Sequence, residues 1–271
     1  DIQTLNIQAV QLNNSLAYTP LLIGITQEGD SIPNDSILNG MTLLPNQMAI
    51  GATWNPAYAE LTGKILGSEL SALGVNLLFG PSLDVLDQVT PNSATEVGTR
   101  TFGGDPYWVG KMGQAYIKGI HEGSDNRVAV IASHFPGIGS TDRQPDEEIA
   151  TVRKSLELLK QVELSPFFAV TNLDQPVEQI VDGLLLSHTR YQGFQGNILT
   201  STKPVSFDAT ALETILALPE IDPWRENGGV IISDDLGSEA VRKFFDPLGT
   251  GYDARLDISH KEHIVTSHQS C

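Results

Sequence analysis

Two carboxylates follow an apolar, β-branched run in residues 228–237. Residues 230–232 are typical of a buried strand in a parallel sheet, and Ser233-Asp234-Asp235 comes directly after them. A carboxylate in this position is available for chemistry, because the active sites of parallel α/β barrels lie at the carboxyl ends of the strands. The alternative is that Ser233 or Asp234 caps a helix that begins near Leu236.

Other polar clusters also come directly after apolar runs of the chain. They are Thr26-Gln27-Glu28, Ser82-Leu83-Asp84, Ser133-His134 and Ser187-His188. In a barrel of parallel strands, such clusters converge on one face. The sequence therefore predicts one site that is assembled from distant segments.

Alternating strand and helix patterns must position these side chains. We expect parallel strands near residues 20–25, 75–80, 127–132, 183–187 and 229–233, adjacent in that order, with helices outside. Asn55-Pro56 predicts the start of a helix that ends at Gly74, and further helices are expected over 106–122 and 209–218. No linker interrupts the pattern, so one α/β domain is expected.

Three further segments carry weaker patterns. Residues 1–18 indicate a helix, and residues 204–207 a short strand. Four apolar residues indicate one face of a helix that follows the acidic run 146–148. They are Ile149, Val152, Leu156 and Leu159.

Composition excludes several classes of protein. The 271 residues are 40% hydrophobic and 18% charged, as in ordinary globular domains, and no apolar run reaches the roughly 18 residues of a membrane span. The formal charge of −17 disfavours nucleic acid as a partner. The single cysteine, Cys271, forms no intrachain disulfide. Localisation stays open, although Asp1 is not an initiator Met and secretion is compatible with that.

Seven segments, taken in order, resemble the N-terminal barrel domain of glycoside hydrolase family 3, particularly its single-domain β-N-acetylhexosaminidases. They are Gln27-Glu28-Gly29, Leu43-Leu44-Pro45 with Ala49-Ile50-Gly51-Ala52-Thr53, Glu69-Leu70 with Gly74-Val75-Asn76, Gly80-Pro81-Ser82-Leu83-Asp84-Val85, Arg100-Thr101-Phe102-Gly103 with Asp105-Pro106, His134-Phe135-Pro136-Gly137, and residues 229–236. The resemblance implies a TIM-type (β/α)8-like barrel over residues 1–255.

The resemblance also implies roles for individual residues. Asp234 aligns with the family nucleophile, an ionised carboxylate that attacks the anomeric carbon of the sugar. Arg100 and His134 match the family's sugar-binding arginine and histidine. The alternatives are a salt bridge within a loop for Arg100 and a structural histidine at a strand end for His134. Asp235 is expected to stand at a helix start.

The chain departs from the family pattern at several site positions. Thr26 stands where the family usually has Asp, and Ser133 stands where it has Lys. Ile138 and Ser140 replace a common His and Asp. In the family the carboxylate at the position of Thr26 accepts hydrogen bonds from sugar hydroxyls, and Thr cannot supply a charged acceptor.

The general acid of the family is also altered. The hexosaminidase branch carries an Asp-x-His pair on the loop after residue 139, and Gln144 and Asp146 occupy those places. Asp146 is the candidate acid, with Glu147 and Glu148 as alternatives. The three residues could equally be the acidic first turn of a helix.

The two chain ends do not match the family. We expect an incomplete or irregular barrel, with no eighth strand in the tail 256–271 and another chain as a candidate to complete it. Two functions remain open. One is a retaining, exo-acting β-glycosidase that needs no cofactor and no metal. The other is a pseudoenzyme, an inactive barrel that binds carbohydrate or serves as a structural subunit.

Overall fold

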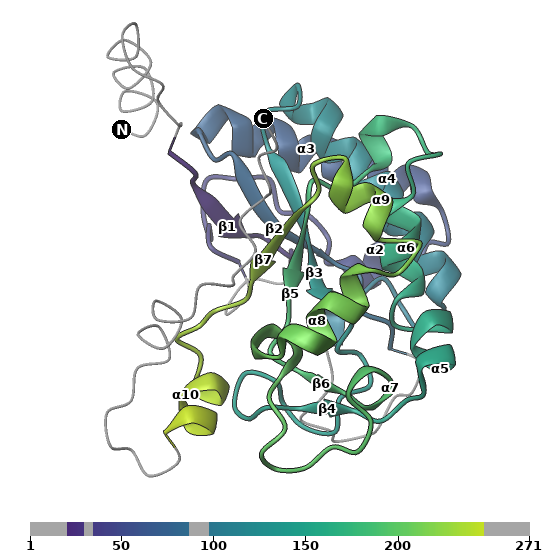
Figure 1. Cartoon of the computed structure of the whole chain (residues 1–271). Helices are drawn as coiled ribbons and strands as arrows, with labels where there is room; N and C mark the ends of the chain where they lie inside the picture. Colours follow the sequence, from purple (N-terminus) through teal and green to yellow (C-terminus); the bar gives the residue numbers. More distant parts are fainter. Residues whose placement is uncertain (1–20, 30–34, 87–97, 247–271) are drawn as a thin grey trace, which may run out of the picture.

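A computed structural model describes residues 21–29, 35–86 and 98–246. Its centre is a sheet of five strands in the order β1-β2-β3-β5-β7 (Figure 1). These are β1 (Gly24–Thr26), β2 (Leu77–Ser82), β3 (Ala129–Phe135), β5 (Gly183–Leu186) and β7 (Val230–Ser233). All neighbours are parallel, which confirms the predicted order and direction.

Helices and short elements connect these strands. They are α2 (Gln47–Gly51), α3 (Pro56–Leu73), η1 (Gly98–Arg100), α4 (Pro106–Ser124), β4 (Thr151–Val152), α5 (Leu156–Gln161), α6 (Ser165–Thr171), η2 (Val177–Gln179), β6 (Arg190–Tyr191), α7 (Gln192–Gln195), η3 (Val205–Phe207), α8 (Ala209–Leu216), α9 (Asp222–Glu226) and α10 (Glu239–Phe245). Figure 1 shows α3, α4, α6 and α9 on one side of the sheet.

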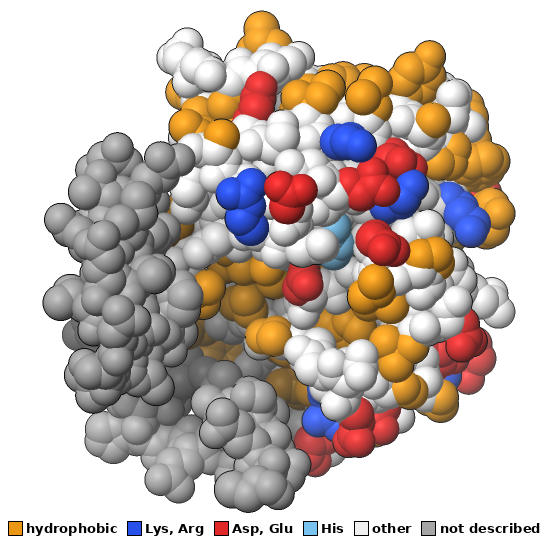
Figure 2. Space-filling view, turned by 90° about the horizontal axis from the view of Figure 1, so that it is seen from above, with side chains coloured by type: hydrophobic (Ala, Val, Ile, Leu, Met, Phe, Trp, Pro, Cys, Tyr) orange, Lys and Arg blue, Asp and Glu red, His pale blue; other side chains and the backbone are white. Residues whose placement is uncertain are grey.

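The two faces of the sheet are both apolar, as expected for parallel strands. Leu78, Val130 and Leu184 point outward into the main core, which they share with the helices. Leu77, Ile131 and Leu185 alternate with them and form a second apolar cluster on the inner face. Figure 2 shows hydrophobic side chains in a hollow beside the grey residues. Within the described ranges, β1 and β7 are the edges of the sheet, and the barrel is not closed.

Local signals set the helix boundaries where the sequence predicts them. The Asn55 side chain accepts a hydrogen bond from the backbone of Ala57, Pro56 opens α3, and Gly74 ends it with a left-handed φ of 85°. Asp105 caps α4 in the same way, by accepting from the backbone of Trp108. These caps fix where the loops at the carboxyl ends of β1 and β2 give way to helices.

The predicted helical face of residues 149–159 is wrong. Thr151–Val152 is strand β4, which pairs in parallel with β6, and helix α5 begins only at Leu156 after the cap Ser155. Thr and Val are β-branched residues that favour strands, and their partner lies far away in the sequence.

The predicted strand at residues 204–207 is also wrong. Its last three residues form the 3₁₀ helix η3. Pro204 has no N–H group to donate, and the run is too short to hold a place in the sheet against this turn. The helix expected over residues 1–18 and the tail 256–271 lie outside the described residues.

Candidate active site

A cleft of about 250 Å³ opens at the carboxyl ends of β3, β5 and β7. It is lined by residues from all three strand ends and from the loop after β3. They are His134, Ile138, Pro145, Asp146, Ser187, His188, Asp234, Asp235, Ser238 and Glu239. Three of the five polar clusters that the sequence places after strands, those at residues 133–134, 187–188 and 233–235, therefore contribute to one cavity, as expected for parallel strands.

Asp234 follows β7 directly and lines this cleft. Its backbone N–H extends the ladder by donating to the carbonyl of Leu186, and its Oδ1 accepts from the backbone of Asp235 at 2.8 Å. The helix-capping alternative is wrong for both Ser233 and Asp234, because α10 begins at Glu239 and is capped by Ser238. Asp234 is thus not committed to a helix end.

Asp235 does not start a helix either, which corrects the expectation from the sequence. Its Oδ1 accepts from the backbone of Gly237 at 2.8 Å and closes a tight turn before α10. This turn ends at Gly237, and the helix begins only after Ser238, whose side chain caps it by accepting a hydrogen bond from the backbone of Val241.

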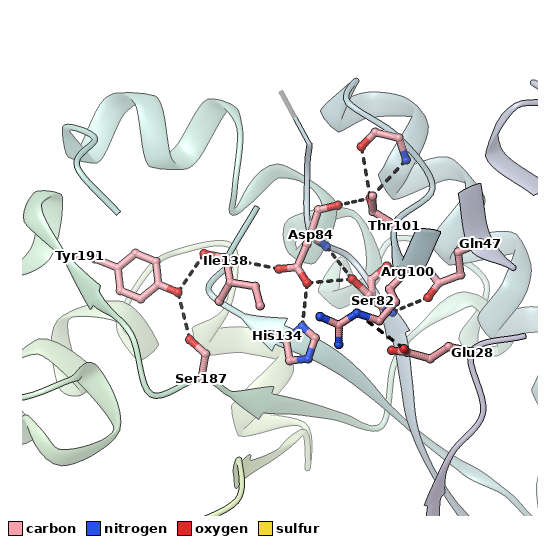
Figure 3. Close-up of polar contacts among 12 residues, drawn as sticks. Glu28, Gln47, Ser82, Asp84, Arg100, Thr101, His134, Ile138, Ser187 and Tyr191 are labelled. Atoms are coloured by element: carbon pink, nitrogen blue, oxygen red, sulfur yellow. Dashed lines mark hydrogen bonds and ion pairs between the residues drawn. The ribbon is translucent and has the colours of Figure 1, made fainter. Parts of the chain in front are cut away.

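His134 is held by a buried carboxylate beneath the cleft (Figure 3). Its Nδ1 lies 2.7 Å from Oδ2 of Asp84, whose side chain is completely buried. Ser82 donates to the same oxygen at 2.8 Å, and the backbone of Ile138 donates to Oδ1 at 2.7 Å. Asp84 therefore connects the end of β2, the end of β3 and the loop after β3.

The electrostatics of this pair favour the charged forms of both groups. Burial opposes ionisation of Asp84, but His134, its hydrogen bond and the Ile138 and Ser82 donors lower the pKa of the carboxyl. Burial likewise opposes the imidazolium, but Asp84 and the charge of Asp234 raise the pKa of His134 to about 9, while Arg100 opposes this rise. His134 is therefore an imidazolium at neutral pH and lies close to both Asp234 and Arg100.

Arg100 ends η1 next to His134. Its Nε lies 3.9 Å from Oε2 of Glu28, a residue of the loop after β1. The next residue, Thr101, donates through Oγ1 to the backbone carbonyl of Asp84. Arg100 is not among the residues that line the cleft itself. It lies beside His134, with its guanidinium paired to a buried acid.

His188 also lines the cleft, but unlike His134 it is neutral. Its Nε2 donates to the carbonyl of Asp235 at 3.1 Å, and its Nδ1 accepts from Ser206 at 2.7 Å. Burial lowers the pKa of His188, although the charge of Asp234 opposes this shift. Asp234 is thus flanked by one charged and one neutral histidine.

Asp146 also lines the cleft, on the exposed loop after β3. Its backbone carbonyl accepts from Ala240, which ties the loop to α10. Glu148 is paired with Arg143 at 2.9 Å and, like Glu147, does not line the cleft. The acidic first turn of a helix is absent here, because residues 145–147 form a turn.

Buried contacts to Glu163 fix the two ends of this loop, at Ser140 and Lys154. Lys154 lies 2.7 Å from Oε1 of Glu163, a fully buried residue, and Ser140 donates to the same oxygen at 2.5 Å. Burial raises the pKa of Glu163, although Lys154 opposes this shift. An Asp at position 140, as in the family pattern, would set a second carboxylate against Glu163. The neutral Ser140 avoids this repulsion.

The sequence analysis placed Asp84 and His188 in polar clusters of the predicted site but assigned neither of them a role. Each lies two residues after the end of a strand, and this position in the sequence indicated that it belongs to the site. Their roles were not visible, because they depend on partners 50 and 18 residues away, His134 and Ser206.

No helix in the described ranges is long and apolar enough to cross a membrane. In the same part of the chain, no three His, Cys, Asp or Glu side chains come together as metal ligands would.

The raised pKa of His134 predicts a pH-dependent stability. The stabilisation is complete below the unfolded pKa of about 6.5 and is lost as the pH rises through about 9, on the order of 3 kcal/mol in all. His134→Gln should remove this alkaline slope in denaturant unfolding measured from pH 6 to 10. His188→Gln is the control and should retain it, because the pKa of His188 is lowered. An unchanged slope in His134→Gln would contradict the charged pair.

Comparison with known proteins identifies the family. Residues 2–254 match the model of the glycosyl hydrolase family 3 N-terminal domain. A Beta-hexosaminidase of Xylella fastidiosa (strain M23) is 31% identical over 87% of this chain, and one of Thiobacillus denitrificans is 29% identical over 92%. The chain spans 65% and 66% of their lengths.

A solved structure gives the same result. The family 3 beta-N-acetylglucosaminidase of Paenibacillus sp. str. FPU-7 is 28% identical, with a TM-score of 0.75 over 96% of this chain and 43% of that one. The predicted fold class is confirmed as TIM-like, with five parallel strands of an unclosed barrel in the described ranges. The chain belongs to the family of glycosyl hydrolase family 3 N-terminal domains.

Proposed function

We propose that this chain is a retaining, exo-acting β-glycosidase that releases terminal β-linked N-acetylhexosamine. The observation that carries the proposal is Asp234 at the carboxyl end of β7, in a cleft that it shares with an imidazolium, His134. The names of the relatives support the choice of sugar, since they are hexosaminidases and an N-acetylglucosaminidase.

Asp234 acts as the nucleophile. Its carboxylate attacks the anomeric carbon, the bond to the leaving oxygen breaks, and a glycosyl ester forms on Asp234. Water then attacks the same carbon, which restores the carboxylate and gives a product with retained configuration. The positive charge of His134 lies on the same side of the cleft as the attacking carboxylate.

His134 and Arg100 bind the terminal sugar. The Nδ1–H of His134 is committed to Asp84, so its second N–H is the group that donates to a sugar hydroxyl. Arg100 offers a planar guanidinium on the same side of the site. His188 donates to the carbonyl of Asp235 and so fixes the backbone beside the nucleophile.

Asp146 is the proposed acid that protonates the leaving oxygen. It lines the cleft on an exposed loop, whereas Glu148 is neutralised by Arg143 and Glu239, another lining residue, lies 3.0 Å from Lys243. The hydrogen bond and the charge of Lys243 lower the pKa of Glu239, which makes Glu239 a poor proton donor. The reaction requires two carboxyl groups and no cofactor.

Carbohydrate is the proposed substrate. The proposed protein partner is another chain that completes the barrel. A closed barrel leaves no strand edge open, whereas β1 and β7 are edges in the described residues. We propose that another chain covers those edges. The boundary proposed at residue 255 separates the barrel domain from the tail 256–271.

The test of this function is turnover of a panel of aryl β-glycosides by wild type and by Asp234→Asn. The wild type should hydrolyse the N-acetyl-β-hexosaminide, and the variant should lose at least about a thousandfold in kcat, because the amide cannot form the ester intermediate. Asp235→Asn is a matched control next to it and should retain most of the activity. Sugar binding without turnover by wild type would instead support the inactive, carbohydrate-binding barrel.

The role of Asp146 predicts a dependence on the leaving group. Asp146→Asn should slow the hydrolysis of poor leaving groups, such as alkyl glycosides, far more than that of nitrophenyl glycosides, which need little protonation. The measurement is kcat/KM for leaving groups of graded pKa. Glu147→Asn should have little effect, since Glu147 does not line the cleft. A uniform loss across all leaving groups in Asp146→Asn would remove Asp146 from this role.

A further inference from the structure

Three aromatic side chains lie together on the surface near the candidate site. Trp54 follows α2, and Tyr107 and Trp108 lie in the first turn of α4. The rings of Trp54 and Trp108 are 5.3 Å apart at 90°, and those of Tyr107 and Trp108 are 5.8 Å apart at 80°. Trp54 is 58% exposed and Tyr107 is 63% exposed. We call these three residues the aromatic platform.

Trp54 is held in a backbone conformation that costs energy. Its φ is 53°, in the left-handed region that bulky residues rarely adopt. A tight turn enforces this conformation, since the backbone of Trp54 donates to Gly51 and Thr53 bonds both Ile50 and the backbone of Asn55. Trp54 thus combines a strained backbone with a large side chain that is exposed to solvent. Such strain is typical of binding positions.

The platform adjoins the candidate site through direct packing. A side chain at Gly51 would collide with the carbonyl of Phe102, so α2 lies against the segment that follows Arg100. Asp105, in the same segment, caps the helix that carries Tyr107 and Trp108. The helices that carry the platform therefore both attach to the segment 100–105, at the barrel end where the cleft opens.

We propose that the aromatic platform binds a neutral β-linked oligosaccharide and holds the units of a long substrate that lie beyond the cleft. This proposal rests on the proposed function for the choice of sugar. The apolar C–H faces of pyranose rings stack on aromatic rings, while their hydroxyl groups stay in water. The charge of −17 disfavours an anionic ligand.

The size of the platform favours a sugar over a protein partner. An aromatic side chain offers about 150–250 Å² of surface, so three partly exposed rings offer roughly 300 Å². A stable protein interface needs about 800 Å² from each partner. Roughly 300 Å² suits two or three sugar rings, because a small ligand needs only a few large contacts.

The direct test measures binding of a β-1,4-linked N-acetylglucosamine hexamer by calorimetry in the Asp234→Asn background, where no hydrolysis interferes. Trp54→Gly and Tyr107→Ala should each weaken binding about tenfold. Glycine accepts a φ of 53°, so Trp54→Gly relieves strain and its loss of binding is not a loss of folding. Val177→Ala, at an exposed residue before β5 and hence at the opposite end of the barrel, is the control and should bind like the background.

Turnover of an aryl monoglycoside separates this proposal from the proposed function. With Asp234 intact, Trp54→Gly and Tyr107→Ala should leave its kcat and KM unchanged, because the small substrate does not reach the platform. Hexamer binding that is unchanged in both variants would overturn the platform while the hydrolase stands. Weakened hexamer binding in a protein that never hydrolyses any glycoside would overturn the hydrolase while the platform stands.

Discussion

The buried ion pair between Asp84 and His134 is the constraint on which the rest of the site depends. Asp84 has no exposed surface, so its charge must be satisfied within the protein, and His134, Ser82 and the backbone of Ile138 do this together. Removing one partner would leave a buried charge unpaired. The pair fixes the ends of two strands and the loop that leads to Asp146, and it places a positive charge beside Asp234.

The site departs from its family where charge would be hard to satisfy. Ser140 bonds a buried glutamate that is paired with Lys154, and Ile138 supplies only its backbone N–H to Asp84 while its side chain packs near Leu86. Thr26 bonds Ser36. At these positions uncharged side chains therefore stand where the family pattern has charged ones, while Asp146, Asp234, Asp235 and Glu239 still bring carboxyl groups to the cleft.

Local signals in the sequence predicted the order of the sheet and the boundaries of α3, because runs such as Val230-Ile231-Ile232 and caps such as Asn55 act over a few residues. Local signals did not predict features that depend on partners distant in the sequence. Thr151–Val152 is a strand only because Arg190–Tyr191 lies beside it. Asp84 and His188 stood at predicted strand ends, but their hydrogen bonds and charge states follow from folding alone.

Covalent trapping tests directly whether Asp234 is the nucleophile of a retaining glycosidase. A 5-fluoro N-acetylhexosaminyl fluoride, whose glycosyl ester is hydrolysed slowly, would be incubated with the wild-type chain, and its peptides would be analysed by mass spectrometry. We expect one sugar per chain, attached to the peptide that contains Asp234 and localised to its carboxylate. A sugar attached to Asp146, Glu239 or any other residue would contradict it, as would hydrolysis with inverted configuration.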